Sequence, residues 1–104
     1  MTFWLVTATP HPELLGELEQ ALRERRFEPL QPFGRALSAG LVNARRKGGQ
    51  ACWEEEDYCD PPLAEERAAV LDRYFTSIEV EAVEEGQGWR QLTALPRLFS
   101  GLSR

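Results

Sequence analysis

One acidic segment holds the densest group of reactive side chains in this chain. Five carboxylates fall within seven residues, next to a tryptophan, a tyrosine and a cysteine. The segment reads Trp53-Glu54-Glu55-Glu56-Asp57-Tyr58-Cys59-Asp60. Alternate residues of a strand share a face, so we expect Glu54 and Glu56 on one face and Glu55 on the other. Paired carboxylates bind divalent cations, and crowding raises the pKa of one of them, which suits acid–base chemistry.

The simpler interpretation of these glutamates is structural. Gly48-Gly49 favours a hairpin turn, because glycine adopts positive φ at little cost. Glu54 and Glu56 would then pair across the hairpin with Arg45 or Lys47, and each pair would contribute roughly a few tenths of a kcal/mol. We favour these ion pairs over a cation site, since the segment lacks the spacing of a calcium-binding loop.

An enzyme or a small-ligand-binding protein would need residues from several segments. His11 is the only histidine and suits a general base. Arg35 suits an anion clamp, and Glu54, Glu56 and Tyr58 suit acid–base roles. This hypothesis requires the fold to gather them around one pocket. The sequence has no phosphate-binding loop, dinucleotide fingerprint, nucleophile elbow or zinc-protease motif.

The cysteines give no metal-binding signature. Structural zinc sites usually pair cysteines about two to four residues apart, whereas Cys52 and Cys59 are seven apart. Free cysteine is also among the most buried residue types. His11 could in principle join the two cysteines in a metal site, but a spacing of seven on a strand and the loop after it does not favour one. We therefore expect no metal and no cofactor.

Charge argues against nucleic acid and membrane partners. The formal net charge is −5, which repels phosphate backbones and anionic lipids. The basic run Arg45-Arg46-Lys47 and the tryptophans Trp4 and Trp53 invite comparison with RNA-recognition modules, which stack bases on strand aromatics. However, glycines and glutamates follow the basic run where those modules carry further aromatic residues. We expect neither partner.

Hydrophobic periodicity predicts the elements that position these residues. Ile78, Val80 and Ala82 alternate with glutamates, as in a half-buried strand. Asp60-Pro61-Pro62 is typical of a helix start. The expected strands are 3–8, 37–41, 50–56 and 78–82, with a short edge strand at 89–92, and the expected helices are 13–26 and 60–73. This order predicts an α+β, ferredoxin-like βαββαβ two-layer sandwich with both helices on one face of an antiparallel sheet.

Length and composition indicate one domain. The chain has 104 residues, of which 42% are hydrophobic and 28% charged, values that exclude wholesale disorder. We expect a single domain over residues 1–93 and a C-terminal tail over residues 94–104. Two cysteines are too few for a secreted disulfide framework, and the N-terminus lacks a signal-peptide pattern, so we expect a cytoplasmic location.

The first strand predicts an interaction surface. Phe3-Trp4-Leu5-Val6 is apolar on both faces, whereas helices would cover only one face of the sheet. A second copy or the C-terminal tail would cover the other face, and we favour a homodimer. The expected interface residues are Phe3, Trp4, Val6, Trp53, Leu95, Leu98 and Phe99. We therefore expect a small non-catalytic module that acts through protein–protein contacts, as a dimer or as a subunit of a larger assembly, with the enzyme or ligand binder as the alternative.

Overall fold

A computed structural model describes residues 2–102, and Met1, Ser103 and Arg104 lie outside the described part. The strands are β1 (Thr2–Pro10), β2 (Arg45–Lys47), β3 (Gln50–Asp57) and β4 (Phe75–Val83). The helices are η1 (Pro12–Leu14), α1 (Leu15–Arg23), α2 (Gly34–Val42), α3 (Ala64–Glu66), the π-helical η2 (Arg67–Leu71), α4 (Asp72–Tyr74) and α5 (Gln87–Leu92).

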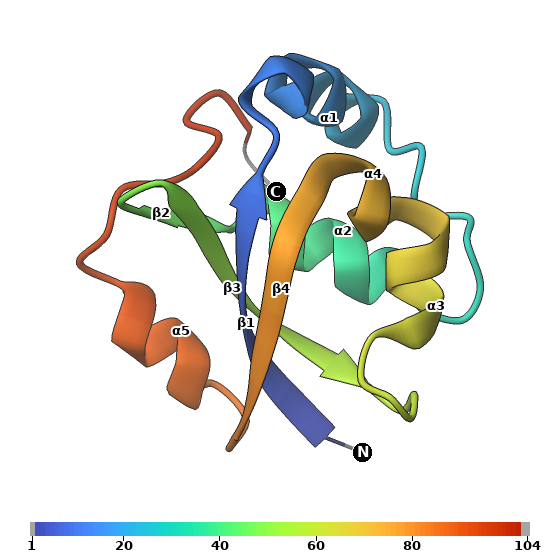
Figure 1. Ribbon diagram of the computed structural model, residues 1–104, viewed down its shortest axis with the longest axis vertical. Helices are drawn as coiled ribbons and strands as arrows, with labels where there is room; N and C mark the ends of the chain where they lie inside the picture. Colours follow the sequence, from blue (N-terminus) through green and yellow to red (C-terminus); the bar gives the residue numbers. More distant parts are fainter. Residues whose placement is uncertain (1, 103–104) are drawn as a thin grey trace.

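The four strands form one antiparallel sheet in the order β2-β3-β1-β4 (Figure 1). Val6 of β1 lies between Trp53 of β3 and Val80 of β4. The predicted α+β class and antiparallel sheet are confirmed. The hairpin turns at Gly48, which has φ 61° and so adopts the left-handed conformation that glycine favours.

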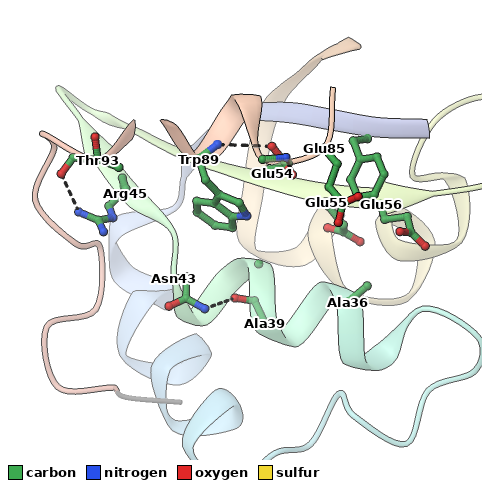
Figure 2. A pocket seen from close by; sticks show the side chains of 13 residues that line it. Ala36, Ala39, Asn43, Arg45, Glu54, Glu55, Glu56, Glu85, Trp89 and Thr93 are labelled. Atoms are coloured by element: carbon green, nitrogen blue, oxygen red, sulfur yellow. Dashed lines mark hydrogen bonds between the residues drawn. The ribbon is translucent and has the colours of Figure 1, made fainter. Parts of the chain in front are cut away.

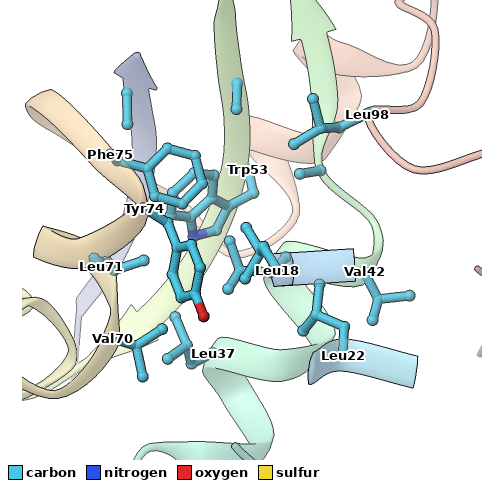
Figure 3. Packing of buried hydrophobic residues seen from close by; sticks show 14 of the residues in the cluster. Leu18, Leu22, Leu37, Val42, Trp53, Val70, Leu71, Tyr74, Phe75 and Leu98 are labelled. Atoms are coloured by element: carbon cyan, nitrogen blue, oxygen red, sulfur yellow. The ribbon is translucent and has the colours of Figure 1, made fainter. Parts of the chain in front are cut away.

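The main core lies between the sheet and helices α1 to α4 (Figure 3). Trp53 and Phe75 pack with ring centroids 5.4 Å apart, and leucines from α1 and α2 surround them. Leu18 and Leu22 are fully buried, as their helical spacing predicts. Other core members include Val6, Leu37, Leu41, Leu63, Val70 and Leu71.

Two predicted strands are wrong, because both segments are helical. Residues 37–41 lie within α2, where Leu37 and Leu41 are one helical turn apart and both fully buried. A short apolar run fits either a strand or a helix, and packing against the sheet decides between them. Residues 89–92 are the last four residues of α5 and do not form an edge strand.

Helix α5 covers the sheet face opposite the main helix layer. Figure 1 shows α5 across the sheet from α2 and α3. A Cβ built on Gly88 would lie 3.4 Å from Leu5 Cδ1, so α5 approaches the outward side of β1 closely. The apolar character of both faces of β1 therefore has an intramolecular explanation.

The segment after α5 packs on the main core. Leu98, Phe99 and Leu102 belong to the core cluster, and the Leu98 N–H donates to the Ala44 carbonyl at 2.9 Å. Arg45 and Arg97 form an isolated antiparallel bridge at the outer edge of β2. The segment thus fills the side of the helix layer. Among the described residues, no helix has the length and apolar character needed to cross a membrane.

Candidate functional site

The acidic end of β3 places its carboxylates in two separate environments. Glu54 faces α5: its Oε1 accepts from the Gly88 N–H at 2.8 Å and from the Trp89 N–H at 3.4 Å, and its Oε2 accepts from the Gly86 N–H at 2.8 Å. These bonds satisfy main-chain donors at the first turn of α5, which have no partner within the helix. The predicted ion pair of Glu54 with Arg45 or Lys47 is replaced by this capping role.

A groove of about 590 Å³ follows β3 between α2 and α5. Figure 2 shows the Trp89 indole reaching from α5 toward α2, with Ala36 and Ala39 on the opposite wall. Gly40 lets α2 pack closely on β3, since a Cβ there would lie 2.8 Å from Trp53 Cδ1 and 3.4 Å from the Glu54 carbonyl oxygen. Small residues therefore bring α2 against β3 at Glu54, and the groove reaches the strand at the half-buried Glu56.

The floor of the groove is a strand edge. β2 pairs with β3 only from Gln50 to Cys52, while β3 continues to Asp57. In an antiparallel pair, hydrogen-bonding residues alternate along each strand, and a two-residue hairpin closes on a hydrogen-bonded pair. Gln50 and Cys52 therefore direct their main-chain groups toward β2, and Glu54 and Glu56 direct theirs the same way beyond its end.

The charged side chains around the groove are unevenly distributed. Glu56 and Glu85 line one end, and Arg45 lines the other (Figure 2). The Arg45 guanidinium already donates to the Leu95 carbonyl at 2.7 Å and to the Thr93 carbonyl at 3.4 Å. The carboxylate end consequently dominates the local electrostatics.

A second carboxylate group lies on the helix face of β3. Glu55 is 2% exposed and Glu66 is fully buried. Glu55 Oε1 accepts from the Trp53 indole N–H at 3.0 Å. Burial and a hydrogen bond to Glu66 raise the pKa of Glu55 well above its ordinary value, and burial likewise raises the pKa of Glu66. The two glutamates therefore favour a shared proton.

The loop after β3 wraps around Asp57. The Asp57 Oδ2 accepts from the Leu63 N–H at 2.7 Å and from the Cys59 N–H at 3.0 Å. Cys59 Sγ lies 3.6 Å from Glu65 Oε1 and 4.0 Å from Glu66 Oε1. An interaction with Glu65 acts to lower the pKa of the Cys59 thiol, but partial burial and the charge of Asp57 outweigh it, so this pKa is raised.

A small cavity of about 100 Å³ adjoins this loop. Its polar lining includes Asp57, Cys59 and Glu66 together with Glu56 and Glu65, and Phe33 and Pro32 form part of its apolar wall. Within the described residues, one carboxylate oxygen from each acid and the Cys59 sulfur lie within 4.8 Å of one another.

The structure separates the residues of the enzyme hypothesis. His11 and Arg35 line neither of these cavities. Glu54 and Glu56 line the groove, while the Tyr58 side chain, 71% exposed, borders the smaller cavity. The pocket that this hypothesis requires is therefore not formed by these five residues together.

The expected interface residues also have separate positions. Four of them are buried within the chain, namely Val6, Trp53, Leu98 and Phe99. Phe3 lines the groove, Trp4 is partly buried against the core, and Leu95 is half-buried. Among the described residues, the exposed large hydrophobic side chains are Tyr58 and Val80, so the large apolar patch expected on the sheet is absent there.

Sequence reasoning missed Glu66 and Trp89. Glu66 follows the helix-start signal and resembles an ordinary exposed acid of a first turn. One signal was present: Val70 and Leu63 lie four and three residues away from Glu66, which places all three on one helix face. Trp89 was assigned to a strand, and its place in the groove depends on α5.

Comparison with protein-family models, with curated proteins and with solved structures found no match for this chain.

Proposed function

We propose that this chain is a non-catalytic module that binds a partner protein, and that the partner adds an extended segment along the free edge of β3. The observation that carries this proposal is the mismatch between the two hairpin strands: β3 runs to Asp57, but β2 pairs with it only to Cys52. An unpaired strand edge offers main-chain donors and acceptors to an added strand.

The groove gives this edge its specificity. An added strand would place alternate side chains toward Trp89 on one side and toward Ala36 and Ala39 on the other. Glu56 and Glu85 at one end favour a segment with lysine or arginine there. The partner we propose is therefore a basic, β-prone segment of another protein.

A second copy of this chain is a poorer occupant. Pairing two β3 edges by a two-fold axis would bring the acidic segment 54–57 of one chain against the same segment of the other. Like charges directly opposite each other on paired strands are destabilising. The net charge of −5 on each copy adds to the repulsion.

The test uses a synthetic peptide of about ten residues that alternates lysine with valine, and a matched peptide with glutamate in place of lysine. We expect the basic peptide to bind at micromolar concentration, with an affinity that falls as salt rises. Ala39→Trp should fill the groove and weaken binding at least about 10-fold, while Ala69→Trp, at an exposed site on η2, should not.

Equal binding by both peptides, or full binding by Ala39→Trp, would contradict the proposal. Sedimentation of the chain alone provides the second readout. A stable dimer that Ala39→Trp disrupts would identify the occupant as a second copy instead.

Two further parts of this proposal concern class and location. We propose a ferredoxin-like core, supported by β1 and β3 as central antiparallel neighbours and by helical connections after each of them. The second helix after β1 and the added α5 are elaborations of that pattern. An experimental structure without adjacent β1 and β3 would contradict it.

A cytoplasmic location is supported by the free thiols of Cys52 and Cys59, and localisation of a tagged chain would test it.

A further inference from the structure

We propose that Asp57, Cys59 and Glu66 bind one divalent transition-metal ion, and that Zn²⁺ is the ion their donor set fits best. The three donor atoms lie within 4.8 Å of one another. Tetrahedral zinc with ordinary bond lengths separates its ligand atoms by about 3.4–3.7 Å. Small rotations of these side chains would therefore close the site.

The burial of Glu66 is an independent indication of a ligand. This glutamate is fully buried, and among the described residues no N–H or hydroxyl group donates to its Oε2; its acid neighbours Glu55 and Asp57 can bond to it only through a proton. Buried polar atoms are nearly always paired, and an unpaired carboxylate is especially costly to bury. The same carboxylate borders the small cavity with its Oε1 4.0 Å from Cys59 Sγ, so a cation there would give Glu66 the positively charged partner that the neighbouring acids cannot supply.

Glu55, next to Glu66, has a second buried carboxylate oxygen of this kind. Among the described residues no N–H or hydroxyl group donates to its Oε2, and its carboxyl group is hydrogen-bonded to that of Glu66. One shared proton could serve both glutamates. A bound cation would instead attract the negative charge of Glu66 directly, with Glu55 orienting that ligand from behind.

The donor set selects the kind of ion. One thiolate with two carboxylates suits zinc and similar borderline ions, whereas magnesium and calcium prefer oxygen ligands throughout. Main-chain N–H groups of Cys59 and Leu63 hold Asp57 Oδ2 at 3.0 and 2.7 Å, which fixes that carboxylate. The cavity of about 100 Å³ has room for a water molecule as the fourth ligand.

The spacing of the cysteines could not reveal this site. Cys52 lies on the outer face of β3 with its Sγ 3.7 Å from Thr7 Oγ1, away from Cys59. The co-ligands of Cys59 are instead two acids, one at the end of β3 and one in α3. Asp57 is the last residue of β3, but it pairs with Thr2 of β1, and Cys59 and Glu66 lie outside the strand. Variants of Cys59 and Glu66 therefore test this inference without altering the proposed strand edge.

The test measures Zn²⁺ binding to the full chain, reduced and freed of metal by a chelator. We expect one Zn²⁺ per chain by calorimetry and a rise in melting temperature of about 5 °C with excess Zn²⁺. Co²⁺ should give the near-ultraviolet charge-transfer absorbance of a thiolate ligand. Millimolar Mg²⁺ or Ca²⁺ should produce neither change.

Variants assign the binding to these residues. Cys59→Ser and Glu66→Gln should each weaken Zn²⁺ binding at least about 10-fold. Cys52→Ser and His11→Gln are matched controls and should bind Zn²⁺ like the parent chain. If Glu66→Gln does not fold, Cys59→Ser alone decides, because Cys59 lies partly exposed in a loop.

Three results would overturn the inference. The first is no Zn²⁺ binding at millimolar concentration. The second is Co²⁺ binding without thiolate absorbance. The third is parent-like affinity in Cys59→Ser, which would show that any bound ion lies elsewhere on this acidic chain.

Discussion

Glu54 and Glu55 are neighbours in sequence and both nearly buried, yet their surroundings differ completely. Glu54 meets main-chain N–H groups at the start of α5, while Glu55 meets one indole N–H and a second glutamate. The first carboxylate has donors for both of its oxygens, and the second has an oxygen without a partner. Burial alone therefore does not indicate chemistry. A buried acid that lacks donors is the one that is free to hold a proton or a cation.

Removing the Glu54 side chain should cause the largest loss of stability. Glu54→Ala leaves the Gly86 and Gly88 N–H groups without their acceptor, and we expect the free energy of unfolding to fall by about 3 kcal/mol. Glu56→Ala, on the same face of β3 but half-buried, is the control and should change it by about 0.5 kcal/mol or less. Urea denaturation followed by tryptophan fluorescence measures both. Equal losses in the two variants would mean that the bonds to α5 contribute little.

A substitution at Gly88 tests the position of the Glu54 carboxylate while leaving its charge in place. A Cβ on Gly88 would lie 2.9 Å from Glu54 Oε1 and 3.2 Å from Glu54 Cβ, so something must move. We expect Gly88→Ala to cost about 1–3 kcal/mol, because overpacking displaces the capping bonds. Gly16→Ala is the control, since nothing lies within 4 Å of a Cβ there. A parent-like stability in Gly88→Ala would mean that α5 shifts freely.

The pH dependence of stability should reveal the buried environment of Glu55, which has few hydrogen-bond donors. Because the pKa of Glu55 is raised by folding, its proton stabilises the fold below the ordinary value of 4.5, and this contribution is lost as pH rises through the folded pKa. One proton gives a slope of at most about 1.4 kcal/mol per pH unit. Glu55→Gln should flatten the profile above the ordinary value of 4.5. An unchanged profile in Glu55→Gln would assign that slope to other groups.

The exposed carboxylate of Glu17 should have the smallest effect on stability, and its pH dependence should be opposite to that of Glu55. Glu17 accepts two hydrogen bonds from Arg73 and one from the Tyr74 hydroxyl, and Arg73, followed by Tyr74, lowers the pKa of Glu17 to about 2. Its contribution is present above the ordinary value of 4.5 and is lost as pH falls toward 2. We expect Glu17→Gln to lower the melting temperature only slightly at neutral pH, because solvent screens the pair. A chemical-shift titration of the Glu17 side chain would check the pKa directly, and an ordinary value would show that Arg73 and Tyr74 do not hold the carboxylate in solution.

Local signals in the sequence determined much of this molecule. Apolar spacing placed Leu18 and Leu22 in the core, Gly48-Gly49 turned the hairpin, and strand alternation put Glu54 and Glu55 on opposite faces. These features depend on residues a few positions apart, whose relative directions follow from the period of the strand or helix. That is why they could be derived without the fold.

Only the tertiary structure decided what each face meets. The run 37–41 became a helix because its leucines pack under the sheet, and 89–92 became part of α5, which covers the other face. Periodicity states which side a residue occupies but not which distant segment arrives there. The N–H groups that bond to Glu54 lie 32 to 35 residues further along the chain. Glu66, the acid beside Glu55, lies eleven residues further along. Their meeting depends on how the layers pack, and that packing separates a structural carboxylate from one available for a proton or a metal ion.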